Sequence, residues 1–211
     1  MILCDIGNTN VHLLKEGEFA IESLKRFSAS AFSGEVYYIC VNNSLHATLK
    51  RRENFIDLES FIKFDTPYKG IGIDRICACK SVYEGVVVDA GSAITVDVMS
   101  GGKHQGGFIL PGLKAYEKAY KDISMRLDIG INREVLLNAL PKNTKDAVSF
   151  AVLKSLILTI QNVSDGKNIY FTGGDGEYLS GFFKNGIFDK MIVLKTLINT
   201  VEELKKGKFK C

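Results

Sequence analysis

Two short acidic turns in the sequence carry residue types that suit phosphate and metal chemistry. They are Asp5-Ile-Gly-Asn-Thr9 and Asp89-Ala-Gly-Ser-Ala93. Glycine lets the backbone approach an anion closely, and successive N–H groups in such a turn form a concave site for phosphate oxygens. Because Mg²⁺ binds few carboxylates together with phosphate oxygens, the aspartates fit a metal-bridged phosphate site. Each turn taken alone favours an ordinary hairpin turn, but two matched copies, each after a buried apolar strand, favour the phosphate interpretation.

A third acidic residue, Asp74, has the features of a proton acceptor. It belongs to Gly72-Ile73-Asp74-Arg75 and falls in the first turn of a helix predicted from about residue 73 to 83. The helix dipole stabilises an anion there, so we expect an ionised base with a low pKa. Phosphoryl transfer needs such a carboxylate, and Arg75 could pair with an acceptor carboxylate or with the phosphoryl group. The alternative is a helix-start aspartate beside a surface arginine, which composition alone favours.

The segments that must position these residues follow the same order twice. Strands are predicted at residues 2–6, 11–15, 21–27, 36–41, 61–64, 86–88, 94–99, 106–110, 169–172 and 191–194. Asp5 and Asp89 lie 84 positions apart, which is too far for a solenoid repeat and indicates a duplicated α/β domain. We therefore expect lobes at 1–84 and 85–211 with a central cleft at the strand ends, where α/β folds bind ligands.

Two later segments bear on the same site. The longest predicted helix, 144–163, carries an apolar stripe at helical spacing, and Thr144 is expected to cap its first turn through its hydroxyl. Gly173-Gly174 follows a predicted buried strand. A glycine pair there could let adenine or ribose lie against the backbone, and a simple strand-to-helix turn explains it equally well.

Composition excludes several classes of partner. The net charge of +3 is too small to indicate nucleic acid or a membrane surface, and the hydrophobic fraction of 46% is ordinary for a globular protein. The five cysteines have no framework spacing, which favours reduced thiols. No signal peptide or membrane-spanning run is apparent, so we expect a cytoplasmic protein.

These motifs together resemble the type III pantothenate kinases, a branch of the actin, sugar-kinase and Hsp70-like ATPase superfamily. The resemblance covers nearly the whole chain, and its most specific part is Gly72-Ile-Asp-Arg75 between the two turns. The remaining matched segments are Asp5–Thr9, Pro67-Tyr68, Val88–Asp97, Gly106–Gly112, Asn143-Thr144 and Thr172–Asp175. The implied fold is a duplicated ribonuclease H-like, actin-like ATPase fold. Ser92 stands where threonine is commoner, which keeps a hydroxyl at that position.

The resemblance also implies an activity and a set of residue roles. The activity is ATP-dependent phosphorylation of pantothenate, the first step of coenzyme A biosynthesis, with Asp74 as proton acceptor. Asp89 would bind a monovalent cation, K⁺ or NH₄⁺, while Asp5 would hold Mg²⁺ through water, and the protein would be a homodimer. The implied ATP-binding residues are Asp5, Ile6, Gly7, Asn8, Thr9, Asn10, Val11, His12 and Ser92. The implied pantothenate-binding residues are Tyr68, Gly72, Ile73, Asp74, Arg75 and Thr144, the last reaching the neighbouring subunit's pocket.

Two other functions remain open at this point. One is a kinase of the same fold with a different acceptor such as a sugar, although few polar side chains between the turns could bracket many hydroxyls. The other is an actin-like or regulatory protein that binds nucleotide without phosphorylating a small molecule, in which Asp74 would be dispensable. The histidines His12, His46 and His104 form no constellation in the sequence and are expected to be bystanders.

Overall fold

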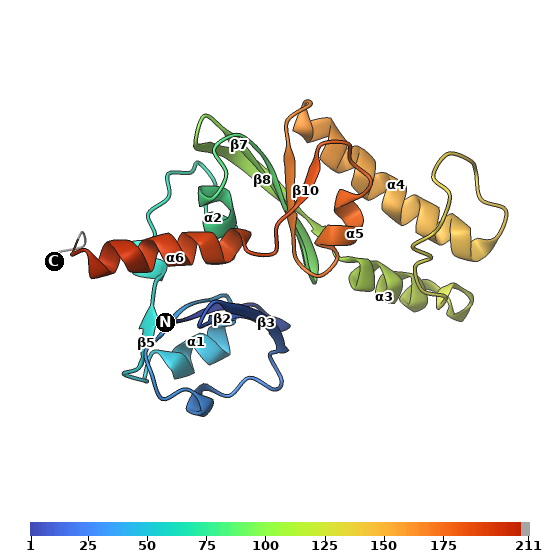
Figure 1. Cartoon of the computed structure of the whole chain (residues 1–211). Helices are drawn as coiled ribbons and strands as arrows, with labels where there is room; N and C mark the ends of the chain where they lie inside the picture. Colours follow the sequence, from blue (N-terminus) through green and yellow to red (C-terminus); the bar gives the residue numbers. More distant parts are fainter. Residues whose placement is uncertain (208–211) are drawn as a thin grey trace. The chain divides into compact units, whose positions relative to one another are not determined.

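The computed structural model describes residues 1–207 and contains two five-stranded mixed sheets (Figure 1). By compactness the chain divides into two units. Unit 1 comprises residues 1–83, 101–105 and the last segment from residue 190, and unit 2 comprises 84–100 and 106–189. The expected lobes 1–84 and 85–211 stay a prediction. The segment after residue 189 belongs to the first unit because its helix, residues 192–205, packs on elements of that unit.

The sheet of unit 1 has the order β3-β2-β1-β4-β5. The central strands β1 and β4 run parallel, and every residue of β4 is buried, as expected of an apolar run between neighbours. The strand predicted at residues 61–64 is wrong: the short edge strand lies at 55–57, and three residues are too few to show a period. The strands are β1 (Ile2–Ile6), β2 (Asn10–Lys15), β3 (Glu18–Ser23), β4 (Val36–Cys40) and β5 (Phe55–Asp57).

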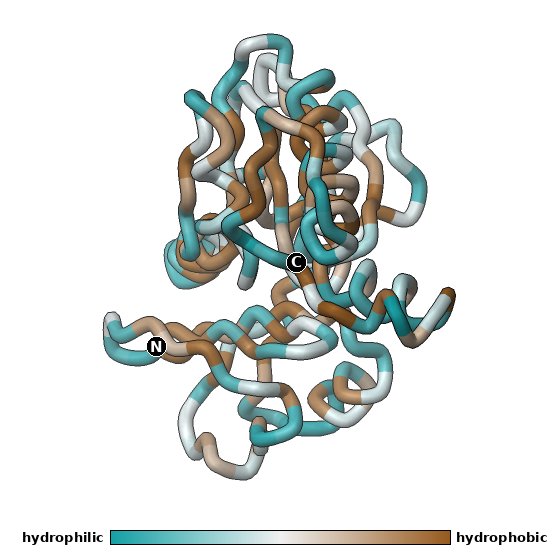
Figure 2. The backbone as a smooth tube through the Cα atoms, turned by 90° about the vertical axis from the view of Figure 1, so that its right-hand side faces the viewer, coloured by the Kyte–Doolittle hydropathy of each residue, from teal (hydrophilic) through white to brown (hydrophobic). Residues whose placement is uncertain are grey.

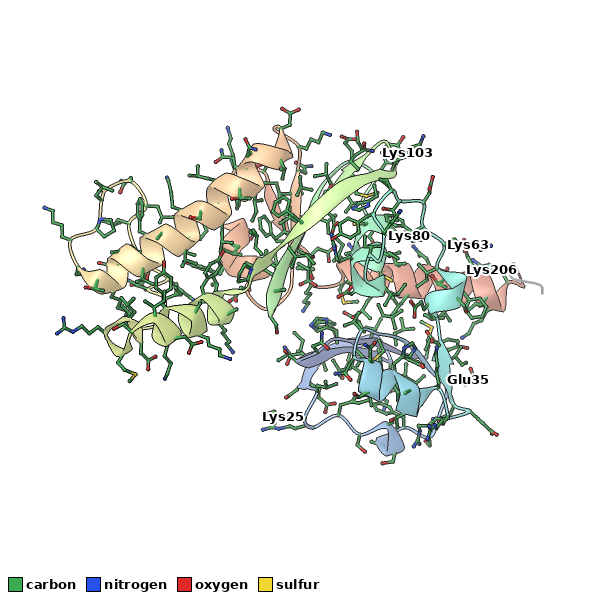
Figure 3. All side chains as sticks on the ribbon, turned by 180° about the vertical axis from the view of Figure 1, so that it is seen from behind. Lys25, Glu35, Lys63, Lys80, Lys103 and Lys206 are labelled. Atoms are coloured by element: carbon green, nitrogen blue, oxygen red, sulfur yellow. The ribbon has the colours of Figure 1, made fainter. Side chains whose placement is uncertain are left out.

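Three helices accompany this sheet: α1 (Asn43–Leu49), α2 (Ile73–Lys80) and α6 (Ile192–Lys205). The helix α6 packs against both α2 and β1. At the contact, Thr196 Oγ1 donates to the Cys77 carbonyl at 2.7 Å, and Ser81 Oγ donates to the Ile192 carbonyl at 2.7 Å. These bonds fix α2, the helix that carries Asp74. Charged side chains such as Lys25 and Glu35 project from this unit (Figure 3).

The second sheet has the order β10-β9-β6-β7-β8, which repeats the first sheet read from the opposite edge. In both, a three-strand antiparallel meander is followed by strands added in parallel on its other side. This shared order confirms the duplicated α/β domain. The strands are β6 (Gly85–Ala90), β7 (Ala93–Ser100), β8 (Lys103–Pro111), β9 (Ile169–Thr172) and β10 (Gly186–Phe188).

The helices of unit 2 are α3 (Leu113–Ile123), α4 (Thr144–Ser164) and α5 (Gly176–Ser180), and short 3-10 turns occur at Ala29–Ala31, Glu59–Phe61 and Met125–Leu127. The predicted stripe on α4 is confirmed, since Val148, Val152, Leu156 and Ile160 are buried. Of these, Val152, Leu156 and Ile160 form one core with the central strands β6 and β9. Figure 2 shows hydrophobic colour running along the strands of the sheets. By length and composition α4 could cross a membrane, but it packs here as a core helix.

Candidate active site

The turn after β1 in unit 1 holds the Asp5 carboxylate next to a histidine. Asp5 is buried and pairs across the strands with His12, whose ring Nδ1 lies 3.0 Å from Asp5 Oδ2. The N–H of Gly7 donates to the carbonyl of Asn10, the first residue of β2, at 3.0 Å. The Gly7 N–H is therefore already hydrogen-bonded within the turn and is not available to a phosphate oxygen. Phosphate contacts from this turn would come from the exposed residues Asn8 and Thr9.

The turn after β6 in unit 2 repeats this geometry. The N–H of Gly91 donates to the carbonyl of Ala93, the first residue of β7, at 3.0 Å. Asp89 stands opposite Thr95 on one side and Thr172 on the other, so its backbone is held between two strands. Ser92 is exposed at the tip of the turn. Both acidic turns thus place a strand-end aspartate behind a glycine bend.

Two further glycines brace the second turn. The N–H of Gly112 donates to the Ser92 carbonyl at 3.2 Å, and a β-carbon on Gly112 would lie 2.6 Å from that oxygen. Gly173 has a φ of +83°, and a β-carbon there would lie 2.7 Å from the carbonyl carbon of Ala90 and against the Asp89 carboxylate. Only glycine permits such close approach. The Gly173-Gly174 turn is therefore packed directly on the Asp89 turn.

Asp74 lies in the first turn of α2, as predicted, and its carboxylate Oδ1 accepts the N–H of Arg75 at 2.8 Å. The expected low pKa is wrong. Burial raises the pKa of Asp74 above its ordinary value, and the Asp5 carboxylate adds to the rise, while the Arg75 N–H and guanidinium oppose it. Desolvation of the charged form outweighs the helix dipole here. A carboxylate with a raised pKa is a better proton acceptor than one in water.

Arg75 is buried beside Asp74, which the surface-arginine alternative did not anticipate. Its exposed fraction is only 6%, and its guanidinium carbon lies 4.6 Å from the ring centroid of Tyr68. The Tyr68 N–H donates to Thr66 Oγ1 at 3.0 Å, and that hydroxyl lies 2.6 Å from His104 Nδ1. Arg75, Tyr68, Thr66 and His104 thus form a connected group in unit 1. Thr66 and Tyr68 lie on the loop before α2, between Arg75 on α2 and His104 on β8.

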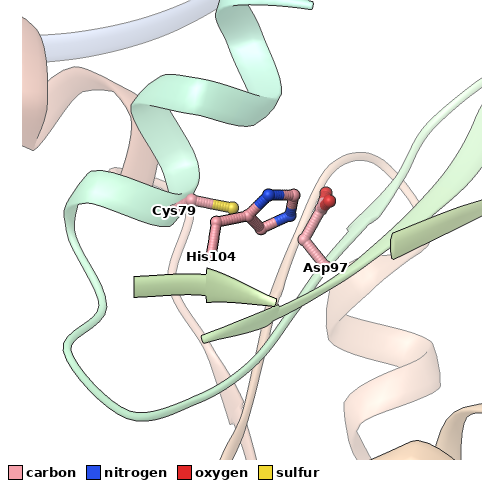
Figure 4. Close-up of side chains that lie close together, drawn as sticks. All are labelled: Cys79, Asp97 and His104. Atoms are coloured by element: carbon pink, nitrogen blue, oxygen red, sulfur yellow. The ribbon is translucent and has the colours of Figure 1, made fainter. Parts of the chain in front are cut away.

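His104, which the sequence pattern predicts to be a bystander, lies at the site in unit 1. His104 is buried and its ring lies near both Phe64 and Tyr68. Figure 4 shows the His104 ring beside the Cys79 thiol on α2. A ring nitrogen of His104 lies within 4.8 Å of Cys79 Sγ. No local spacing could have revealed His104, because its partner Thr66 lies 38 positions away. His12 is among the residues that the resemblance implies for ATP binding, and the structure places its ring beside the Asp5 carboxylate.

The N-terminus of α4 carries the remaining predicted site residue, Thr144. The predicted cap is wrong: Asn143 is the N-cap, and its Oδ1 accepts the Asp146 N–H at 2.9 Å, while Thr144 is the first helical residue. Asparagine caps at least as well as threonine and occurs one position earlier. The Thr144 side chain is exposed, and no capping bond engages it.

The site residues divide between the two units. Unit 1 brings together Asp5, His12, Asp74, Arg75 and Tyr68, while unit 2 carries Asp89, Ser92 and Thr144. Asp5 and Asp89 are the strand-end carboxylates with the chemistry to hold a cation. In unit 1 a buried carboxylate, a second carboxylate with a raised pKa and a buried guanidinium suit charged substrates.

Comparison with known proteins supports the interpretation of these residues. A family model for type III pantothenate kinase matches residues 56–165. A type III pantothenate kinase of Wolinella succinogenes is 48% identical over 99% of this chain and 100% of its own length. One from Campylobacter jejuni is 44% identical over 96% of this chain and 97% of its own.

Solved structures agree on the fold. A Campylobacter jejuni protein, described as a Baf family transcriptional activator, is 43% identical with a TM-score of 0.90 and covers 98% of this chain and 100% of its own. The activator of 2-hydroxyisocaproyl-CoA dehydratase from Clostridium difficile, with bound ADPNP, is 12% identical with a TM-score of 0.52 over 98% of each chain, which shows the fold alone. The fold is the duplicated actin-like ATPase fold, and this chain belongs to the type III pantothenate kinase family.

Proposed function

We propose that Asp74 is the proton acceptor with which this kinase phosphorylates pantothenate from ATP. The activity follows from membership of the family: pantothenate and ATP give 4′-phosphopantothenate and ADP, in coenzyme A biosynthesis. The observation that carries the role of Asp74 is its environment, a carboxylate whose pKa is raised by burial and by Asp5. In this position it would take the proton of the attacking primary hydroxyl as the phosphoryl group transfers.

The residues around Asp74 would bind and orient pantothenate. Arg75 offers a buried guanidinium, and a guanidinium pairs with a carboxylate through two parallel hydrogen bonds. Its stacking on Tyr68 restricts the guanidinium plane, so the direction in which it presents its donors is fixed. Gly72 is the N-cap of α2, and a β-carbon there would lie 2.5 Å from Asp74 Oδ1, so the glycine lets the Asp74 carboxylate fold back over the start of the helix.

The two acidic turns would bind the nucleotide. The first, Asp5 to His12, would cradle phosphates through its exposed tip, and Ser92 in the second would add a hydroxyl. ATP-dependent kinases work with a divalent metal, and Mg²⁺ on the phosphates would neutralise the charge that develops on them. We assign Asp5 as the residue that would bind this Mg²⁺ through a water molecule. His12 orients the Asp5 carboxylate, since its Nδ1 lies 3.0 Å from Asp5 Oδ2. Asp89 would hold the monovalent cation, K⁺ or NH₄⁺.

The protein would act as a homodimer in the cytoplasm. Four large apolar side chains of unit 2 are more than 70% exposed: Ile123, Met125, Leu136 and Leu140. Exposed apolar side chains close in sequence favour a protein interface. They lie in the stretch of chain that leads to Thr144, so a second copy bound there would lie close to Thr144. Sedimentation of wild type and Leu140→Asp tests this: a dimer in the variant contradicts the proposed face.

An ADP-release assay tests the activity and the base together. Wild type and Asp74→Asn are compared with Mg²⁺-ATP, with pantothenate or a sugar, in K⁺ or Na⁺. We expect pantothenate-dependent turnover that K⁺ supports and Asp74→Asn abolishes. Turnover with a sugar alone favours the kinase with another acceptor. Nucleotide binding without any turnover favours a regulatory protein, and full activity of Asp74→Asn removes Asp74 as the base.

A further inference from the structure

The segment between α3 and α4 contains two neighbouring residues that contact different parts of unit 2. Arg133 forms an ion pair with Asp175, and its guanidinium carbon lies 4.7 Å from the ring centroid of Tyr178. The Tyr178 hydroxyl donates to the Arg133 carbonyl at 2.7 Å. Asn132 contacts α4 instead: its N–H donates to Ser149 Oγ at 2.7 Å and its Nδ2 donates to Asp146 Oδ1 at 2.8 Å.

The contacts of Arg133 lead to the nucleotide side of the unit. The N–H of Asp175 donates to the Ala90 carbonyl at 2.9 Å, inside the second acidic turn. Gly173, two residues earlier, lies against the Asp89 carboxylate. Arg133 therefore holds, through one residue, the turn that carries Asp89.

The contacts of Asn132 lead to Thr144. Asp146 accepts hydrogen bonds from Asn132 and from Asn143 Nδ2, the latter at 2.6 Å, and these bonds lower the pKa of Asp146. Asn143 is the N-cap of α4 and the residue directly before Thr144. Asn132 therefore fixes, through Asp146, the end of α4 that presents Thr144.

We propose that Asn132 and Arg133 form a connector that couples the Asp89 turn to the N-terminus of α4. Neither residue need touch a substrate, so both are positioning residues. The proposal rests on the assignment of nucleotide to the Asp89 turn and of pantothenate to Thr144. A peptide bond joins the two, so displacement of one turn is transmitted to the other. The consequence is reciprocal: each substrate raises the affinity for the other.

Exposure separates this role from a purely structural one. Half of the Arg133 side chain is exposed, and exposed ion pairs contribute little to stability. Removing Arg133 should therefore leave the melting temperature nearly unchanged while it releases the Asp175 turn. A residue that served stability alone would give the opposite pattern.

The test measures the affinity for Mg²⁺-AMPPNP by calorimetry, with and without saturating pantothenate. Wild type is expected to bind the analogue more tightly when pantothenate is present, and Arg133→Ala and Asn132→Ala are expected to remove that difference. Arg133→Ala should also weaken analogue binding by no more than about fivefold, because an exposed ion pair that holds the turn contributes at most about 1 kcal/mol. Glu134→Ala, whose side chain belongs to neither contact set, is the matched control and should behave as wild type.

Other outcomes are equally decisive. The connector is overturned if wild type shows no such difference although it turns over pantothenate, or if the difference persists in both variants. If Arg133→Ala does not fold, Asp175→Asn, which removes the ion pair from the other side, replaces it with the same expectations. If wild type releases no ADP with pantothenate, the proposed function fails instead. The effect of Arg133→Ala on the analogue affinity then still tests the nucleotide half of the connector.

Discussion

Gly173 lies directly against the carboxylate of Asp89, in a backbone conformation that residues other than glycine rarely adopt. The two residues end neighbouring parallel strands, since Asp89 pairs with Thr172 in the register of β6 and β9. The Thr172–Asp175 turn thus packs directly on the Asp89 turn. Arg133 contacts the same Thr172–Asp175 turn through its ion pair with Asp175.

Substitution of this glycine should damage the Asp89 turn selectively. In Gly173→Ala the new β-carbon would meet Asp89 and lie 2.7 Å from the Ala90 carbonyl, at a φ of +83°. Strain of this kind costs about 1–3 kcal/mol. We expect a lower melting temperature and a raised KM for ATP. Gly174→Ala is the control, because nothing lies within 4 Å of its β-carbon position; equal effects in both variants would contradict this account.

Asp74→Asn should lose activity and gain stability. An asparagine Oδ1 still accepts the Arg75 N–H but takes no proton, so turnover should fall about 10²–10⁴-fold with little change in KM for ATP. The folded-state pKa of Asp74 is raised, so the fold favours the protonated form. The stability this contributes is present below the unfolded pKa and lost as pH rises through the folded pKa.

At neutral pH the ionised Asp74 therefore costs stability that a neutral asparagine does not. Thermal unfolding at pH 7 should show Asp74→Asn melting at or above the wild-type temperature. At a pH below the unfolded pKa the two should converge. A variant that melts well below wild type at pH 7 would show that the carboxylate stabilises the fold, contrary to the direction of its pKa shift.

The pH dependence of turnover should respond to Asp5. Activity requires ionised Asp74, so it should fall as pH drops through the raised pKa of that group. Burial is the larger cause of the rise and Asp5 contributes. Hence Asp5→Asn should move the acidic limb of the residual kcat profile to lower pH, and Arg75→Ala should move it to higher pH. If the acidic limb moved in the same direction in both variants, a group other than Asp74 would control the acidic limb.

Much of the fold could be predicted because its signals are local. The apolar strands before Asp5 and Asp89, and the stripe on α4, follow from periods of two and 3.6 residues. The duplication followed from the two D-x-G turns, and both sheets share one strand order. The position of α6 was not predictable, because its bonds to Cys77 and Ser81 join residues more than 100 positions apart.

The candidate site was only partly predictable for a related reason. Residue type and spacing identified Asp5, Asp74 and Asp89, but not their electrostatics. The pKa of Asp74 depends on burial and on Asp5, which the sequence does not place. Likewise, His104 joins the site through Thr66 across a long loop closure, and no local pattern marks such a contact.

Asn143 and Thr144 are neighbours whose substitutions should separate stability from substrate binding. Asn143 caps α4 and also donates to Asp146, so Asn143→Ala should cost about 1 kcal/mol of unfolding free energy. Thr144 makes no capping bond, so Thr144→Ala should leave the melting temperature nearly unchanged and raise KM for pantothenate. Thr144→Ser, which keeps the hydroxyl, should restore that KM. Because a cap and a binding hydroxyl act on different equilibria, a Thr144→Ala variant that lost stability without a change in KM would return Thr144 to a purely structural role.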